Sequence, residues 1–335
     1  MRVLLVGEAA EHEADLRPHL DPAVEVVALP AEAATTDAHD DAIDVDDVVV
    51  SLRLRRNGAP LPPFRLLHVP GAGLDGIDLD ALDPRTTVAN VYEHEIPIAE
   101  FVLARLLEWE IRAADMQAAF GPDTWARTYR RRAEHGELHG RSLGIAGYGR
   151  IGRAIAARAA AFGMRVVAVD DHAAGHDHAQ VLPTSRLPDV AAGADRFVVA
   201  CPLTDDTRGM VDAALLDRMP SDAVLVNVSR AEIIDEDALW HALRHNSIGG
   251  AILDVWYRYP SPADPTPAPA AHPFWELPHA WCTPHSSAWT RSLARRRYAV
   301  IADNVERLAS GRPLRNTVRT GVEADADRAC SRRST

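Results

Sequence analysis

Three glycines in one short segment carry the first chemical signal of the sequence. In GYGRIG, Gly147, Gly149 and Gly152 follow the apolar run SLGIA and precede RAIAARAAAFG, which has the periodicity of a helix. Glycines at this place allow a tight turn, so that a pyrophosphate can rest on the N–H groups at the start of the helix. The segment predicts a dinucleotide-binding turn.

An aspartate completes this pattern. The helix is expected to end at Gly163, and the following strand, MRVVAV, finishes at Asp170. A carboxylate at this place holds the ribose hydroxyls of a dinucleotide. Asp171 follows and no arginine is adjacent, so the two carboxylates would repel the 2′-phosphate of NADP. The sequence therefore favours NAD as the cofactor.

The elements that position these residues alternate in type along the chain. Up to the segment RLLHV, short β-branched runs alternate with Ala-rich or acidic segments, which is typical of a parallel sheet. A second series opens at LGIAGYGRIG and runs through VVAVD, FVVACPLT, AVLVNVSR and GAILDVW. The predicted fold class is α/β, with two doubly wound parallel-sheet domains and a cleft between them.

Helices, a loop and a tail are expected outside these series. The segment from Ile96 to Phe120 is apolar on more than one helical face, as in a helix buried by another domain or a second subunit. SLARRRYAVIADNVERLASG predicts a last helix closed by Gly311. The Pro- and Ala-rich residues 260–273 predict a loop of open role. Residues 319–335 are polar and without pattern, which predicts a disordered tail.

Composition limits the class of protein. A chain of 335 residues can bury two cores, and its 25% charged and 47% hydrophobic residues are typical of a soluble protein. No apolar run is long enough to span a membrane, and nothing in MRVLLVGEAA directs export, so a cytoplasmic location is expected. The net charge of −12 argues against nucleic acid as a partner. The three separated cysteines form no metal-binding motif, and no metal is expected.

Several motifs follow one another in an order that carries a resemblance. They are LLHVPGAGLDGIDL, HEIPIAEFVLARLLE, the glycine segment, CPLTDDTRGMVDAALLDRMPSDAVLVNVSRAEIIDEDAL, LDVW and TPHSSAWT. Over almost its whole length the chain resembles the D-isomer-specific 2-hydroxyacid dehydrogenases, a superfamily with phosphoglycerate, formate and phosphite dehydrogenases. The resemblance implies a flavodoxin-like substrate domain of residues 1–94 and 286–318, and a Rossmann NAD domain of residues 95–285. It also implies a homodimer through the NAD domain.

The resemblance assigns the groups that act on a small anionic substrate. Reduction of a 2-oxo acid needs one group that fixes the carboxylate and another that protonates the carbonyl oxygen. Arg230 matches the family's substrate arginine, whose planar fork grips a carboxylate. His285 matches its acid/base histidine. Gly71, Ala72 and Gly73 match a loop whose N–H groups bind the same carboxylate.

Cofactor contacts follow from the same resemblance. Asp254 matches the aspartate that hydrogen-bonds the nicotinamide amide, and Pro202 and Leu203 would flank the adenosine half. The full set of expected cofactor residues is Gly147, Tyr148, Gly149, Arg150, Ile151, Gly152, Asp170, Cys201, Pro202, Leu203, Thr207, Val228, Ser229, Asp254 and His285.

The identity of the substrate stays open in the sequence. Arg53 follows the strand DDVVVSL, together with Arg55 and Arg56, at the level of a substrate-contacting loop. These cations would suit a second anionic group, as in a dicarboxylate, a phosphorylated acid or a phosphonate. Trp256 and Trp289 could instead form an apolar wall.

One position departs from the family's pattern. Most members read D-V-F-x-x-E-P, with the glutamate beside the histidine, whereas this sequence reads DVWYRYP and places Tyr259 there. A carboxylate raises the pKa of an imidazole, while a neutral phenol only orients it. We therefore expect His285 to be mostly neutral at pH 7. A neutral imidazole is a base, which favours oxidation, or a substrate such as formate, phosphite or a phosphonate that needs little proton transfer.

Two alternatives stay open beside this interpretation. A register shift in the Pro- and Ala-rich loop would bring Asp264 or Glu276 to His285, and Glu95 could reach it from the segment between the domains. A second class of function is an NAD-sensing corepressor that binds peptides, because a weakened site would permit it. The presence of both Arg230 and His285 favours the enzyme.

Overall fold

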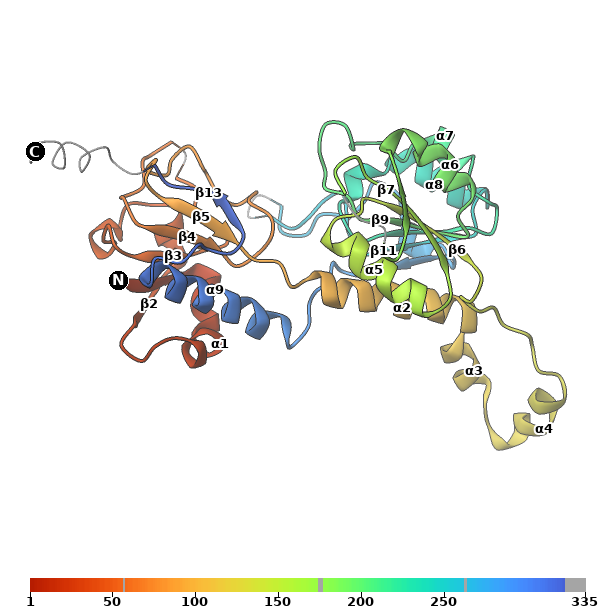
Figure 1. Ribbon diagram of the computed structural model, residues 1–335. Coiled ribbons are helices and arrows are strands. Elements are labelled where there is room, and N and C mark those ends of the chain that lie inside the picture. The colour runs from red at the N-terminus through yellow and green to blue at the C-terminus, as the bar shows by residue number, and fades with distance from the viewer. Residues whose placement is uncertain (57, 174–176, 262–263, 323–335) are drawn as a thin grey trace, which may run out of the picture. The chain divides into compact units, whose positions relative to one another are not determined.

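The chain forms two compact units. The computed structural model describes residues 1–56, 58–173, 177–261 and 264–322. Unit 1 comprises Met1–Glu93 and Thr290–Thr335, and unit 2 comprises His94–Trp289. Each unit contains its own, largely parallel sheet (Figure 1), so the predicted α/β class is confirmed.

Unit 1 is built on a sheet with the order β13-β5-β4-β3-β1-β2. β1 to β5 pair in parallel, and β13 is antiparallel to β5. The order 2-1-3-4-5 is that of flavodoxin-like sheets, as expected. The strands and α-helices of this unit are β1 (Arg2–Val6), α1 (Glu13–Leu16), β2 (Glu25–Leu29), β3 (Val48–Val50), β4 (Leu66–Val69), β5 (Thr87–Asn90), α9 (Leu293–Ala309) and β13 (Thr317–Arg319).

Helix α9 covers one face of this sheet beside α1 (Figure 1). Tyr298, Ile301 and Val305 recur at helical spacing, so their side chains form one apolar stripe that is buried against β1, β3 and β4. The helix ends shortly before Gly311, whose φ of +66° closes it as the sequence predicted.

The start of the C-terminal tail differs from the prediction. Arg319 belongs to β13, and its guanidinium donates to the carbonyl oxygens of Leu79 and Asp83. Val322 N donates to Pro84 O. The prediction of a disordered tail from Arg319 onward is therefore wrong for residues 319–322, and the rest of it lies outside the described residues.

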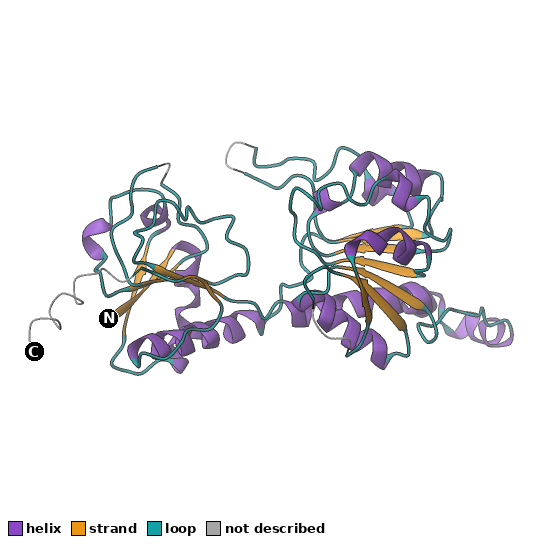
Figure 2. Cartoon of the chain, turned by 45° about the horizontal axis from the view of Figure 1, so that its top comes forward, coloured by secondary structure: helices purple, strands orange, loops and turns teal. Residues whose placement is uncertain are grey.

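Unit 2 carries a fully parallel sheet with the order β12-β11-β10-β9-β6-β7-β8. The strand order 3-2-1-4-5-6 with one added strand is that of a Rossmann sheet, and helices lie on both faces (Figure 2). Its α-helices and strands are α2 (Glu95–Ile111), α3 (Ala113–Ala119), α4 (Pro122–Arg130), β6 (Ser142–Ala146), α5 (Arg150–Ala161), β7 (Arg165–Val169), β8 (Gln180–Leu182), α6 (Leu187–Ala192), β9 (Arg196–Val199), α7 (Ala213–Leu216), β10 (Val224–Asn227), α8 (Glu236–Arg244), β11 (Gly250–Leu253) and β12 (Ala280–Cys282).

Helices α2 and α5 pack together on one face of this sheet (Figure 1). Leu103 and Leu106 of α2 are buried in the same cluster as Ile155, Ala156 and Ala159 of α5. The alanines let the two helices approach closely, and this holds the start of α5 against the end of β6.

The long helix expected from Ile96 to Phe120 is interrupted. Arg112 has φ of +56°, which ends α2, and α3 and α4 follow as separate helices. The break is stabilised locally, because Glu108 accepts from the backbone N–H groups of Arg112 and Ala114. Among the helices of the described residues, none is both long and apolar enough to cross a membrane.

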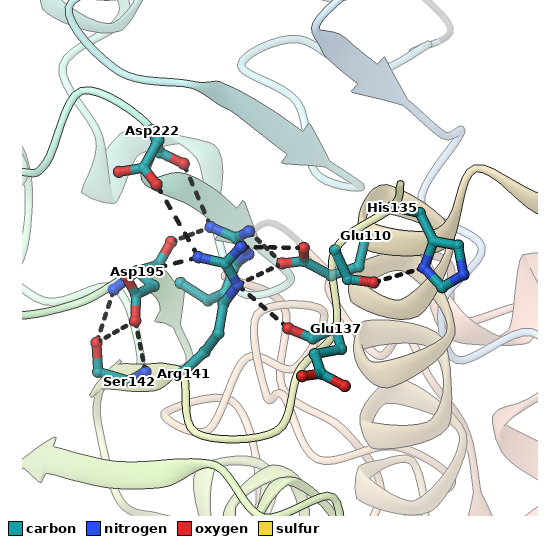
Figure 3. A network of polar contacts seen from close by, with 9 residues as sticks. Glu110, His135, Glu137, Arg141, Ser142, Asp195 and Asp222 are labelled. Carbon is teal, nitrogen blue, oxygen red and sulfur yellow. Dashed lines mark hydrogen bonds and ion pairs between the residues drawn. The ribbon is translucent and has the colours of Figure 1, made fainter. Parts of the chain in front are cut away.

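A buried carboxylate joins the end of α2 to the amino ends of the strands. Glu110 accepts hydrogen bonds from Arg196 at the start of β9 and from Arg141 just before β6 (Figure 3). Gly136 N donates to the backbone oxygen of Glu110 at 3.0 Å, which fixes the chain returning from α4. The side chains of Glu110 and Arg196 are 4% and 3% exposed, so each charge depends on the other.

We predict that Glu110→Gln destabilises the protein by about 3–5 kcal/mol, because it leaves the buried guanidinium of Arg196 without a counter-charge. Urea unfolding measures this loss. Asp222→Asn is the matched control: its carboxylate is 71% exposed and lies 4.0 Å from Arg141, so the change should be about 0–1 kcal/mol. Equal losses in the two variants would contradict the dependence of Arg196 on Glu110.

Candidate active site

The carboxyl ends of the parallel strands in unit 2 bring the predicted residues to one edge of the sheet. Each of six neighbouring strands is followed there by a residue that the sequence singled out. In chain order they are Gly147 after β6, Asp170 after β7, Cys201 after β9, Arg230 after β10, Asp254 after β11 and His285 after β12.

The glycine turn is shaped for close backbone approach. Gly147 has φ of +98°, and a Cβ there would lie 2.7 Å from the backbone of Cys201. A Cβ on Gly152 would lie 2.2 Å from Gly147 O. The turn therefore admits no side chain at either position, and it leads directly into the first turn of α5 at Arg150, where N–H groups favour an anion.

Asp170 is fixed beside this turn. Its carboxylate accepts hydrogen bonds from the backbone N–H groups of Tyr148, His172 and Ala173 at 2.8 to 2.9 Å. Asp171 accepts from the backbone N and the hydroxyl of Thr184. Both carboxylates are thus held in place at the carboxyl end of β7, the strand next to β6.

A cavity of about 610 Å³ opens next to these carboxylates. Its size and its acidic, small-residue lining fit the adenosine half of a dinucleotide. Gly147, Asp170, Cys201, Pro202 and Thr207, which the sequence assigned to the cofactor, line it, and Leu203 is not among its lining residues. The sequence reasoning missed its other lining residues, which include His172, Thr184, Thr204, Asp206 and Met210.

The thiol of Cys201 is a lining group without chemistry of its own. Burial raises its pKa to about 11, so it stays protonated near neutrality and is a poor nucleophile. Its backbone oxygen accepts from the hydroxyl of Ser229, which links the ends of β9 and β10.

Asp254 organises the loop that carries the histidine. Its side chain is fully buried, and it accepts from the Thr283 hydroxyl at 2.5 Å and from the backbone N–H groups of Ser286 and Ser287 at 2.9 Å. The residue between these anchors, His285, has φ of +55°, an unfavourable conformation for a residue with a side chain. The three hydrogen bonds hold it there.

Tyr259 lies against the histidine. Its hydroxyl oxygen is 2.8 Å from His285 Nδ1 and accepts from Trp256 N at 3.1 Å. The indole of Trp256 donates to Thr283 O at 2.8 Å. The loops after β11 and β12 are therefore joined by hydrogen bonds that the sequence reasoning did not include, since a backbone N–H leaves no trace in the residue type.

The carboxylates considered as alternative partners lie elsewhere. Within the described residues, no hydrogen bond or ion pair joins Glu276, Asp264 or Glu95 to His285. Glu276 is exposed in a short turn, Asp264 N bonds to Ser261, and the Glu95 carboxylate lies 3.9 Å from His94 Nδ1.

Burial keeps the imidazole of His285 neutral. Partial burial lowers the pKa of His285, Arg230 lowers it further, and Asp254 opposes both. Because the ordinary pKa of about 6.5 is already below neutrality, the ring is mostly uncharged at pH 7. Burial likewise raises the pKa of Tyr259, so the phenol keeps its proton at that pH.

Arg230 lies at the same edge of the sheet, and hydrogen bonds fix its backbone. Asn227 accepts from Ser229 N and donates to Arg230 O, and one guanidinium nitrogen of Arg230 donates to Ser229 O at 2.9 Å. The side chain is exposed. Its charge acts on the pKa values of both Tyr259 and His285, so the three side chains form one cluster.

The residues predicted for substrate binding in unit 1 follow β3 and β4. Gly71 O accepts from Val91 N, and Ala72 O accepts from the Asn90 side chain at 2.9 Å. The backbone of this loop is thereby fixed, while Gly73 is exposed.

The arginines of unit 1 divide into two kinds. The side chain of Arg53 is exposed, and its backbone is held by Ser51. Arg56 is buried and paired with Asp40 and with Ala33 O. The expectation that Arg56 contributes to an anion site is therefore wrong, because its charge already holds unit 1 together.

Comparison with known proteins decides the family. Residues 103–287 match the family model described as the D-isomer specific 2-hydroxyacid dehydrogenase, NAD binding domain. The chain belongs to the D-isomer specific 2-hydroxyacid dehydrogenase family. This confirms the resemblance found in the sequence, and the match to an NAD binding domain confirms NAD as the cofactor.

Named relatives of this dehydrogenase-family chain act on several substrates. It is 32% identical to a D-3-phosphoglycerate dehydrogenase of Mycobacterium leprae over 256 residues, which cover 76% of this chain and 46% of that one. It is 29% identical to a glyoxylate reductase of Korarchaeum cryptofilum over 253 residues, 73% of each chain. The chain spans about half the length of the phosphoglycerate dehydrogenases that it matches.

A solved structure of another protein has a similar fold. A D-lactate dehydrogenase of Lactobacillus jensenii, determined with NAD⁺, aligns with a TM-score of 0.72 at 22% identity and covers 95% of this chain and 99% of its own. At this identity the likeness concerns the fold.

We predict that Asp254→Asn lowers the pKa of His285, because the negative charge that raises it is removed. NMR titration of the imidazole measures the change. The same variant should lose about 1–3 kcal/mol of stability, since one buried N–H of the loop loses its acceptor. Glu276→Gln is the control and should leave the titration unchanged. A pKa that rises or stays constant in Asp254→Asn would contradict the role given to this carboxylate.

Proposed function

We propose that this protein is an NAD-dependent oxidoreductase that transfers a hydride between nicotinamide and the second carbon of a small 2-hydroxy or 2-oxo acid. The observation that carries the proposal is the cluster of Arg230, His285 and Tyr259 at the same sheet edge as the dinucleotide turn. A carboxylate grip, a proton-transferring ring and a cofactor cradle are the three requirements of this reaction.

Each residue has a role that its geometry supports. Arg230 is exposed and carries a planar fork that can hold the substrate carboxylate and polarise the neighbouring oxygen. His285 exchanges a proton with the substrate oxygen through Nε2, because Nδ1 faces Tyr259. When bound, the nicotinamide would supply or accept the hydride at the carbon.

The direction of the reaction follows from the uncharged ring. A neutral imidazole is a weak acid toward a carbonyl oxygen, whereas it can act as a base toward a hydroxyl group. We therefore propose that Tyr259 takes the place of the family's glutamate and that the protein is biased toward oxidation. The same property favours formate, phosphite or a phosphonate as a second class of substrate, since their oxidation needs little help from an acid.

The choice between the two nicotinamide cofactors rests on Asp170 and Asp171. Both carboxylates line the cavity beside the glycine turn, and each is fixed by hydrogen bonds. A 2′-phosphate would meet two negative charges there, so we propose that NAD is used in preference to NADP.

We also propose that two copies associate through unit 2. Helices α3 and α4 contain no buried residue, and they expose the side chains of Phe120, Trp125 and Tyr129, whose rings contact one another in series. An apolar surface of this kind on a projecting segment (Figure 1) is typical of a subunit contact. The cytoplasmic location expected from the sequence stays a prediction.

Turnover assays with site variants test the activity. We predict NAD reduction with at least one small 2-hydroxy acid, formate, phosphite or hydroxyphosphonate between about pH 6 and pH 10, failing on the acid side where His285 is protonated. His285→Gln should lower kcat by roughly 10²- to 10⁴-fold, because proton transfer is lost. Arg230→Lys should raise KM by roughly 10- to 100-fold, since a forked contact to the carboxylate becomes a single one.

Arg218→Lys is the control for these variants. Arg218 is exposed just before β10, at the opposite edge of the sheet, and its replacement should leave both constants unchanged. Tight binding of NAD without turnover on the whole panel would contradict the proposed activity and favour a sensor role.

A further inference from the structure

The hydrogen bonds around Tyr259 determine which nitrogen of His285 carries the proton. Resting on the function proposed above, we propose that Tyr259 is a positioning residue that holds the resting imidazole in its Nε2–H form, so that the base form needed for oxidation is reached only when the tyrosine hydroxyl turns away or ionises. Tyr259 is thereby a gate on the direction of proton transfer.

The hydroxyl of Tyr259 has two hydrogen-bond partners. A phenol has one proton to donate and accepts hydrogen bonds through a single oxygen. Trp256 N is a backbone N–H group and can only donate, and it lies 3.1 Å from the oxygen. With one hydrogen bond accepted from Trp256 N, the hydroxyl still has its own proton to donate, and the remaining partner is His285 Nδ1, at 2.8 Å.

The hydrogen bond from Tyr259 determines which nitrogen of the imidazole carries the hydrogen. A neutral ring has one donating and one accepting nitrogen, and the hydrogen bond at one nitrogen fixes the state of the other. If Nδ1 accepts from Tyr259, Nε2 carries the hydrogen and meets the substrate as a donor. A donor at Nε2 binds a carbonyl oxygen and cannot take the proton of a hydroxyl group.

A carboxylate at the same position would act in the opposite sense. It only accepts, so it would hold the proton on Nδ1 and leave Nε2 as the base. The protonated phenol of Tyr259 does not hold the proton on Nδ1 in the resting state. It does so when the phenol loses its proton and becomes an acceptor for Nδ1–H. In that state Nε2 can take the proton of the substrate hydroxyl, and bound NAD⁺ would accept the hydride from the adjacent carbon. The imidazolium then passes its extra proton to the phenolate or to water.

The charged groups around His285 and Tyr259 determine the pH at which the phenol ionises. Asp254 and Arg230 face His285 with opposite effects on its pKa, and partial burial lowers it. Tyr259 is influenced by burial, by Trp256 N, by Arg230, and by Asp254 and Glu232, with a net rise of its pKa. The phenol therefore keeps its proton at neutral pH, where the base form is reached only when the hydroxyl turns away from Nδ1. In alkaline solution the phenol ionises and the gate opens.

Nitrogen NMR of the histidine in the full-length protein tests the inference without any substrate. At about pH 9, where the ring is neutral in both proteins, we expect the Nε2–H form in the wild type and the Nδ1–H form in Tyr259→Glu. Tyr257→Phe is the matched control, because the hydroxyl of Tyr257 donates to Ile234 O and not to the imidazole; it should keep the wild-type form. An Nδ1–H ring in the wild type, or an Nε2–H ring in Tyr259→Glu, overturns the proposal.

A kinetic experiment tests the consequence. The rate of oxidation of a 2-hydroxy acid should rise roughly tenfold in Tyr259→Glu, if the base form is populated at about one part in ten in the wild type. The assay is run at about pH 9, because a glutamate raises the pKa of the imidazole and the ring must still be neutral. An unchanged or lower rate in a variant whose ring has switched overturns the gate.

The two experiments separate this inference from the proposed function. Absence of turnover in every variant, with the ring forms as expected, contradicts the activity and leaves the positioning role of Tyr259 supported. Turnover in the wild type with an Nδ1–H ring supports the activity and overturns the gate.

Discussion

The parallel pairing of seven strands in unit 2 is the constraint on which the site depends. Because all strands run the same way, every loop that leaves a strand end does so at one edge. Residues separated by well over a hundred positions, such as Gly147 and His285, are thereby brought to the same side of the sheet. The reversal of strand order at β6 and β9 opens the crevice for the dinucleotide there.

One buried carboxylate on this sheet positions the residues that could do chemistry. Asp254 fixes the loop after β12, and this loop holds His285 in a conformation that it would otherwise avoid. The same loop that carries Asp254 after β11 also places Trp256 and Tyr259 on the other side of the His285 ring. The imidazole is therefore held from two neighbouring strand ends, and its protonation depends on groups that are also structural.

The sequence predicted those parts of the protein that short patterns determine. The glycine turn, Asp170 and the two parallel sheets follow from spacing and from β-branched runs, and Arg230 and His285 follow from the family's motifs. It failed where a single backbone angle decides: Arg112 ends α2 with φ of +56° inside an unbroken apolar pattern. It also failed for Arg56, since a partner sixteen positions earlier, Asp40, cannot be recognised from residue types alone. The backbone N–H of Trp256 is invisible in any motif.

The most direct test of the account is to follow the hydride itself. Small 2-hydroxy acids carrying deuterium at the second carbon would be incubated with NAD⁺, and the products would be analysed by mass spectrometry. We predict deuterium on the nicotinamide ring of the NADH that forms, with the 2-oxo acid in equal amount, and a sharply lower yield in Arg230→Lys. NADH without deuterium, or no product from any acid while NAD⁺ is bound, would contradict hydride transfer as the function of this site.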